Sequence, residues 1–143
     1  MQQELLVPIF ATAILKKGKQ VFLLQRSASR KYAPLKWHLM GGKVEVGESF
    51  TEALIREARE EIGIIIQEKD LTFKHVFFRR SVQPSLVVML FECSVWQSEI
   101  TNIEPEKHIA LGWFDLDKLP EDIVVYHKNA LICAEQGISF SDQ

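Results

Sequence analysis

Residues 49–63 carry signals for both the start and the end of a helix. Ser49 stands three residues before Glu52, the spacing of a capping box in which each side chain satisfies the other residue's backbone N–H. Gly63 can adopt the left-handed conformation that ends many helices. Four-residue steps between them create an apolar stripe, Leu54, Ala58 and Ile62. A helix over Phe50–Ile62 that buries one face is therefore the firmest local constraint on the fold.

Short apolar segments surround this helix and have the length and β-branched or aromatic content of strands. They span residues 5–15, 20–25, 71–78, 86–95 and 109–114. A Lys-Gly turn between the first two predicts a β-hairpin, and residues 27–34 are expected to form a polar loop. A second helix is expected over residues 121–136, between Pro120 and Gly137. Strands interleaved with two helices predict an α/β (α+β) fold, in which helices pack on a mixed sheet.

Length and composition are those of one ordinary globular domain, over residues 1–143. Hydrophobic residues make up 47% and charged residues 25% of the chain, which excludes intrinsic disorder and a disulfide-stapled mini-protein. Seventeen basic and nineteen acidic residues give a net charge of −2, so duplex nucleic acid is not an expected partner. Cys93 and Cys133 lack metal-site spacing and favour a reducing compartment.

The segment 5–15 is apolar enough to imitate the core of a signal peptide. No positive charge precedes it, Pro8 interrupts it, and a lysine-rich turn follows it without a small-residue cleavage site. No segment elsewhere approaches the roughly 18 apolar residues of a membrane helix. We therefore expect a buried strand here, and a cytoplasmic protein that does not bind membranes.

Three glutamates fall on adjacent parts of one face of the first helix. Glu57, Glu60 and Glu61 stand at positions i, i+3 and i+4, and like charges four residues apart cost about 0.2–0.5 kcal/mol in an isolated helix. One explanation is a solvated acidic face that Arg56 and Arg59 partly neutralise. The other is a divalent cation, Mg²⁺ or Mn²⁺, because hard cations bind clustered carboxylate oxygens.

The residues around this cluster extend the pattern. The fixed positions follow the spacing G-x₅-E-x₇-R-E-x₂-E-E-x-G, which runs from Gly42 through Glu48 and Arg56 to Gly63. With each position matched by chance about one time in twenty, a coincidence at seven positions is negligible. Residues 37–64 resemble the Nudix box, the signature of hydrolases that cleave nucleoside diphosphates linked to another moiety.

The resemblance implies a Nudix-type α/β/α sandwich with a mixed sheet between helices, and a role for each matching residue. The metal ligands would be the backbone carbonyl of Gly41 and the carboxylates of Glu57, Glu60 and Glu61. Glu57 and Glu60 would also take part in catalysis, which Arg56 would support by holding the glutamates through salt bridges. Gly42 would permit a close backbone approach, and Glu48 would orient the site from outside. Water would attack the substrate directly.

Other candidate residues have a plain structural alternative. Arg26 resembles a position that contacts phosphate, or is a surface arginine, and Trp37 either stacks on a base or packs in the core. The family often adds a base or metal carboxylate from a later loop, where Glu106 is the first candidate and Glu104 the second, unless the loop is merely solvated. The histidines lack metal-ligand spacing and are expected to be structural or surface residues: His38, His75, His108 and His127.

The small size and unmarked downstream segment resemble MutT-like nucleoside triphosphate pyrophosphohydrolases. The alternative is a nucleoside diphosphate-sugar or ADP-ribose pyrophosphatase, although Arg79 and Arg80 stand where ADP-ribose hydrolases tend to have a proline. A non-catalytic Nudix ligand-sensing module is disfavoured, because such domains commonly lose a box glutamate. The expected partner is a small-molecule nucleotide, bound by a monomer or homodimer.

Overall fold

The computed structural model describes residues 2–80 and 85–143, and this part of the chain forms eight strands and two α-helices. The strands are β1 (Ile9–Lys17), β2 (Gln20–Arg26), β3 (Trp37–His38), β4 (Met40–Lys43), β5 (Thr72–Arg79), β6 (Leu86–Cys93), β7 (His108–Asp115) and β8 (Phe140–Asp142). The helices are α1 (Phe50–Ile62) and α2 (Val125–Glu135), and a 3₁₀ turn, η1, spans Glu68–Asp70.

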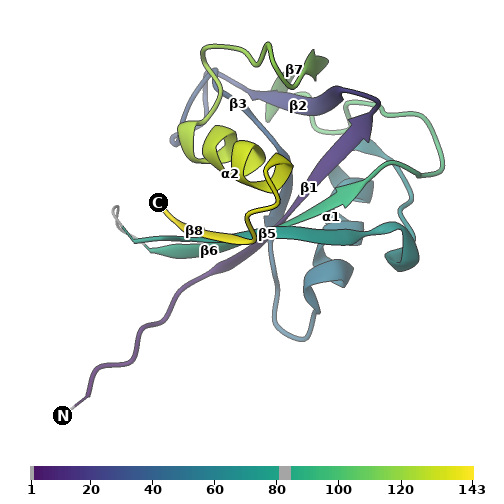
Figure 1. Ribbon diagram of the computed structural model, residues 1–143. Helices are drawn as coiled ribbons and strands as arrows, with labels where there is room; N and C mark the ends of the chain where they lie inside the picture. Colours follow the sequence, from purple (N-terminus) through teal and green to yellow (C-terminus); the bar gives the residue numbers. More distant parts are fainter. Residues whose placement is uncertain (1, 81–84) are drawn as a thin grey trace.

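Strand β1 lies at the centre of a mixed sheet (Figure 1). It pairs antiparallel with β4 and parallel with β6, and β5 and β8 continue the sheet beyond β6. At its other end, β1 turns through Gly18, which has a φ of 58°, into β2. Strand β2 pairs with β3 and β7. The predicted hairpin and the predicted mixed sheet are both confirmed.

The two α-helices cover opposite faces of this sheet, because successive side chains of a strand point to opposite sides. Ala11, Ala13 and Leu15 of β1 pack in one hydrophobic cluster, which contains the apolar stripe of α1. Ile14 packs in the other cluster, which contains Ala130, Leu131 and Ala134 of α2. The helices accordingly lie on either side of β1 in Figure 1. The α/β/α sandwich is confirmed.

Several predicted boundaries are wrong. Strand β1 begins at Ile9 rather than at residue 5, and Leu5 and Leu6 are 68% and 86% exposed on a segment that runs away from the body of the molecule (Figure 1). Pro8 separates this segment from the sheet, since proline has no N–H for a ladder hydrogen bond. Strand β6 ends at Cys93 rather than at residue 95, and β8 was not predicted at all.

Helix α2 begins at Val125, four residues later than predicted. Residues 121 and 122 form a turn instead, and Ile123 makes an isolated parallel bridge with Trp37 of β3. The backbone N–H of Trp37 donates to the carbonyl of Asp122, and the N–H of Val124 donates to the carbonyl of Trp37, at 2.9 and 2.8 Å. These tertiary hydrogen bonds satisfy backbone groups that a helix starting at Pro120 would have used locally.

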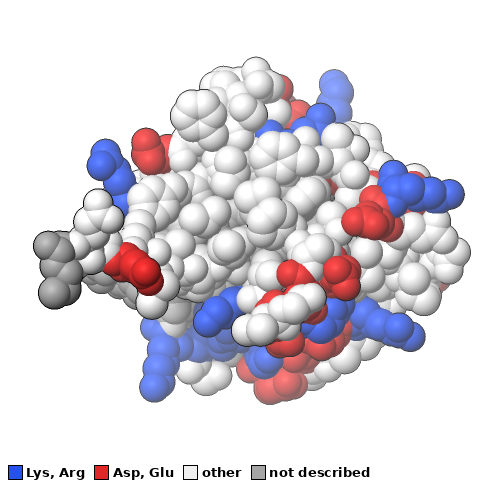
Figure 2. Space-filling view, turned by 90° about the horizontal axis from the view of Figure 1, so that it is seen from below, with Lys and Arg blue, Asp and Glu red and all other residues white. Residues whose placement is uncertain are grey.

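The described residues contain no helix with the length and apolar character that crossing a membrane requires. On the face seen in Figure 2, basic and acidic side chains are interspersed around a largely uncharged centre. Among the residues described, that face therefore shows no continuous basic surface of the kind that binds duplex nucleic acid.

Helix α1 begins and ends as its sequence predicts. The Ser49 hydroxyl accepts the backbone N–H of Glu52 at 3.1 Å, and the Glu52 carboxylate accepts the backbone N–H of Ser49 at 3.2 Å. At the other end, Gly63 has a φ of 70°, and its N–H donates to the carbonyl of Arg59. Both caps are confirmed. Burial of Leu54, Ala58 and Ile62 in the core sets the rotation of the helix and hence the direction of its acidic face.

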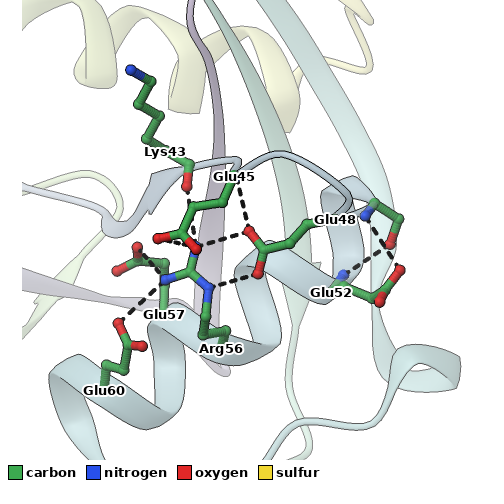
Figure 3. A network of polar contacts seen from close by, with 8 residues as sticks. Lys43, Glu45, Glu48, Glu52, Arg56, Glu57 and Glu60 are labelled. Carbon is green, nitrogen blue, oxygen red and sulfur yellow. Dashed lines mark hydrogen bonds and ion pairs between the residues drawn. The ribbon is translucent and has the colours of Figure 1, made fainter.

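Arg56 ties the loop before α1 to the helix itself (Figure 3). Its Nε and Nη2 donate to the two carboxylate oxygens of Glu48, at 2.6 and 2.9 Å. Its Nη1 donates to Glu57 at 2.9 Å and to Glu60 at 3.2 Å, and Nη2 also reaches the carbonyl of Lys43 at 3.2 Å. One guanidinium therefore offsets three carboxylates, and its bidentate pair with Glu48 holds the loop against the helix.

This pairing predicts a pH dependence of folding stability. Hydrogen bonds from Arg56 lower the pKa of Glu48 from 4.5 to about 2, so the unfolded chain takes up the Glu48 proton at a higher pH than the folded one. The stabilisation is then complete above pH 4.5 and is lost as the pH falls towards 2. We expect Glu48→Gln to lower the free energy of unfolding at pH 7, with the difference from wild type shrinking between pH 4.5 and 2 in urea titrations.

Glu45→Gln is the matched control. The Glu45 side chain is 67% exposed, and its Oε1 lies 3.9 Å from Nη2 of Arg56, so this substitution should change stability little. A Glu48→Gln effect that stays constant down to pH 2, or that Glu45→Gln reproduces, would show that the clamp does not stabilise the fold.

Candidate active site

A cavity of about 580 Å³ is lined by residues from strands β1 to β7, from both α-helices and from the loops between them. Its acidic side chains are Glu57, Glu61 and Glu104. Its basic side chains are Arg26, Arg30, Arg79 and Lys107. An apolar part is formed by Phe10, Leu39, Leu86, Val88 and Val124. Carboxylates, cations and an apolar wall thus surround one space large enough for a nucleotide.

Two glycines allow the acidic helix to approach the sheet. Gly41 and Gly42 line the cavity on β4, and Gly41 is the register partner of Thr12 on β1. A Cβ atom on Gly42 would overlap the carboxylate of Glu57, and one on Gly41 would overlap the backbone of β1. The close approach predicted for Gly42 is therefore present, and it is the Glu57 carboxylate that makes this approach.

Glu61 is the most unusual carboxylate of the site. It is only 5% exposed, and its Oε2 has no hydrogen-bond partner among the described residues. Burial raises the pKa of Glu61 well above its usual range, and the neighbouring Glu57 raises this pKa further. The nearest basic atom to that oxygen is Nε2 of His108, 3.8 Å away, and burial lowers the pKa of His108 to about 4. A buried carboxylate left in this state lacks a counter-charge.

The loop before β7 brings Glu104, and not Glu106, to the site. Backbone N–H groups of Thr101 and Ile103 donate to the carbonyls of Ile62 and Glu61, which fastens the loop to the end of α1. Glu104 lines the cavity and acts on the pKa of Glu61, whereas Glu106 is exposed and is not among the residues that line the cavity. Of the two candidates, the second, Glu104, is therefore the one that lines the cavity.

Of the other predicted site residues, some line the cavity and others lie outside it. Arg26 lines the cavity, where its Nε donates to the carbonyl of Tyr32 at 2.7 Å. Glu60 has a 55% exposed side chain that points to Arg56, outside the cavity lining (Figure 3). Trp37 does not line the cavity either. It packs edge-on against Phe114, with ring centroids 4.8 Å apart, so the expectation that it stacks on a base is corrected to core packing.

Three histidines to which the sequence analysis assigned no function line the cavity. They are His38, His108 and His127. They come from β3, β7 and α2, and the ring centroid of His38 lies 5.4 Å from that of His108 and 6.2 Å from that of His127. Spacing alone could not find them, because the chain folding back on itself brings them together. The one usable signal was the position of His38, three residues before the glycine pair.

The residues present fit a divalent cation, although they are not assembled around one. Among the described residues, no three His, Cys, Asp or Glu side chains form a ready-made metal cluster, and Arg56 engages Glu57 and Glu60. The free Oε2 of buried Glu61, beside a second carboxylate, is nevertheless what a hard cation would satisfy. Glu57 and Glu61, with the carbonyl of Gly41, are the candidate ligands.

The comparisons with known proteins agree with this geometry. Residues 6–132 match the family described as the NUDIX domain. The CTP pyrophosphohydrolase of Escherichia coli (strain K12) is 48% identical over 52 residues, which is 36% of this chain and 38% of that protein. The 8-oxo-dGTP diphosphatase of Proteus vulgaris is 35% identical over 95 residues, which is 65% of this chain and 80% of that protein.

A solved structure supports the same assignment. The crystal structure of a MutT NUDIX hydrolase from Burkholderia pseudomallei superposes with a TM-score of 0.80 and 28% sequence identity, covering 89% of this chain and 97% of that one. The family match over residues 6–132 includes the glycine pair and the acidic helix. This chain belongs to the Nudix family, whose hydrolases act on pyrophosphate bonds and generally use divalent metals.

Proposed function

We propose that residues 1–143 form one Nudix hydrolase domain that hydrolyses a nucleoside triphosphate to a monophosphate and pyrophosphate. The observation that carries the proposal is the buried carboxylate of Glu61, which lacks a counter-charge at one end of a cavity that also holds four basic side chains. Such an arrangement suits a substrate that brings both phosphate anions and a metal. The pyrophosphohydrolases among its relatives support the same class of reaction.

Different residues of the chain would bind the phosphates, hold the metal and position its ligands. Arg26, Arg30 and Lys107 would pair with phosphate oxygens at the cavity wall. Glu57 and Glu61 would hold Mg²⁺ or Mn²⁺, which when bound supplies charge neutralisation and a lower pKa for bound water. Arg56 fixes the direction of Glu57 without lining the cavity. One water adds across the P–O–P bond, and its proton needs an acceptor among the carboxylates.

A substrate panel tests the proposal. Purified protein would be incubated with ATP, GTP, CTP, UTP, 8-oxo-dGTP, ADP-ribose and a nucleoside diphosphate-sugar, each with Mg²⁺, with Mn²⁺ and with excess EDTA. We expect metal-dependent release of pyrophosphate and nucleoside monophosphate from at least one triphosphate. Turnover that EDTA leaves undiminished contradicts the mechanism. Turnover confined to ADP-ribose or the sugar derivative supports the alternative pyrophosphatase, and no turnover at all supports a ligand-sensing module.

Glu61 and Glu60 form a matched pair for the metal site. Glu61→Gln removes a carboxylate that would bind the metal, so we expect a loss of kcat beyond the roughly 10–100-fold that outer partners of a metal contribute. Without metal, the same change should leave the melting temperature unchanged or raised, since it removes a buried carboxylate. Glu60→Gln should lose less, because Glu60 is exposed and pairs with Arg56. Equal losses of kcat and of Mn²⁺ affinity would make Glu60 a ligand of equal standing.

Glu104 and Glu106 form a second matched pair. If Glu104 accepts the proton of the attacking water, Glu104→Gln should lower kcat by roughly 10²–10⁴-fold, with little change in KM, because the lost interaction acts in the transition state. Glu106→Gln should be nearly silent, since Glu106 lies outside the cavity lining. The opposite ranking in steady-state kinetics would return the role to Glu106. Full activity in both variants would leave the proton to the glutamates of α1.

A further inference from the structure

Strands β1, β5 and β6 carry apolar side chains on both faces of the sheet. One face contains Phe10, Phe77 and Val88, which are register partners across these strands and pack with α2. The residues next to them along each strand point to the opposite side. That opposite side is the one on which α1 packs against β1 and β4.

Beyond α1, this second side of the sheet has an apolar surface, which we call the open face. Register pairing places Ile9, Val87 and Phe78 in one row across it, and Val76 and Phe140 in the next. Phe140 is 72% exposed, and the other four are half-buried. In the part of the chain that the structure describes, none of the five belongs to either hydrophobic cluster. Seen from the side opposite α2, the molecule has a largely uncharged centre (Figure 2).

An apolar segment leaves the sheet at the border of the open face. Residues 2–7 read QQELLV and contain a single charge, that of Glu4. Leu5 and Leu6 are 68% and 86% exposed, and the segment runs away from the body of the molecule (Figure 1). It joins β1 through Pro8, whose carbonyl accepts the backbone N–H of Val87 at 3.1 Å. An exposed leucine pair therefore lies within a few residues of the open face along the chain.

The local sequence opposes folding this segment back onto the open face of its own chain. Such a reversal needs a tight turn, but residues 2–9 contain no Gly, Asn, Asp or Ser. Pro8 also disfavours the helical region for Val7 and favours an extended backbone there. The segment is therefore directed outward where it leaves β1, and the open face of another molecule is the apolar surface that it can reach without a turn.

We propose that this chain forms a two-fold symmetric homodimer in which residues 2–7 of each copy lie across the open face of the other. Each copy supplies one segment and one face, so the contact is self-complementary and is made twice. It removes the leucine pair and the open face from water together. The inference does not rest on the proposed function. The cavity stays accessible, because Phe10 and Val88, which line it, lie on the other face of the sheet.

Sedimentation equilibrium of the purified chain tests the association. We expect wild type to have twice the mass of one chain. Leu6→Ser and Phe140→Ser should each raise the dissociation constant by at least about tenfold, the effect of burying one large apolar side chain. Both side chains are exposed in the single chain, so neither change should impair folding. Val95→Ser is the matched control, because Val95 is 61% exposed and lies beyond the end of β6, away from Val87 at its start.

Cross-linking tests whether the segments are exchanged. Chains with Leu6→Cys and chains with Phe140→Cys would be mixed at a concentration where dimers dissociate, concentrated again and treated with a short bismaleimide. Each would also carry Cys133→Ser, which removes the half-buried native thiol, whereas Cys93 is buried. We expect covalent dimers that join the two kinds of chain. In a chain with both substitutions, a cross-link confined to that chain would show that the segment folds back on its own face, which contradicts the exchange.

The remaining outcomes also decide the matter. A monomer at every protein concentration would overturn the proposal. A dimer that Phe140→Ser weakens and Leu6→Ser does not would show that the faces pack without exchange of the segments, and equal weakening by Val95→Ser would show unspecific association. Turnover per chain should be the same in wild type and Leu6→Ser, since the cavity lies on the other face of the sheet. The result of the substrate panel therefore leaves this inference unaffected.

Discussion

The site depends on the guanidinium of Arg56. Helix α1 places Glu57, Glu60 and Glu61 on adjacent positions of one face, where their mutual repulsion opposes helix formation. Arg56 donates to Glu57 and Glu60 and holds Glu48 bidentately, and these hydrogen bonds raise the pKa of the guanidinium above its usual range. A lysine could supply the charge but not this fork of donors. The arginine thus makes an acidic helix compatible with folding before any metal binds.

Glu61 is the one glutamate of this face that Arg56 does not neutralise, and this affects its ionisation. Among the described residues, Arg56 forms no hydrogen bond or ion pair with Glu61, and the Glu61 carboxylate is buried beside Glu57 instead. Without a counter-charge, it is costly to ionise, as its raised pKa shows. A divalent cation would remove that cost, because it is attracted to two adjacent carboxylates and stabilises their ionised form. Glu61 therefore lacks a counter-charge from the protein at the place where the proposed function requires a metal.

The sequence predicted those parts of the fold that local interactions determine. The limits of α1 follow from the Ser49 capping box and from Gly63, whose partners lie within four residues along the chain. The start of α2 does not, because Asp122 and Val124 bond to Trp37, more than eighty residues away. For the same reason, the sequence could not show which of the two loop glutamates lines the cavity. Only the hydrogen bonds from the loop to the end of α1 decide that Glu104 enters the cavity.

The histidines escaped prediction because their environment is created by folding. His38 and His127 are 89 positions apart in numbering, and the backbone N–H and C=O of Leu39 join them through two hydrogen bonds. No periodicity or motif encodes a shared backbone partner of this kind. A single histidine in an apolar context is usually a satisfied core residue, and His75, which bonds to Ile138 and Ser141, fits that description. The orphaned Nε2 of His38 is what distinguishes the two cases.

The short stretch from β3 to β4 contributes His38, Leu39 and the glycine pair to the wall of the cavity. His38 lies in β3, and Gly41 and Gly42 lie in β4, only three and four residues later. Backbone bonds from Trp37 fix one end of the stretch to the segment before α2, and pairing of β4 with β1 fixes the other. The contacts that this stretch makes with a bound substrate would then be held at a distance from Glu57 that the backbone sets. Rigid backbone between two binding groups is how a protein aligns a scissile bond with its catalytic residues.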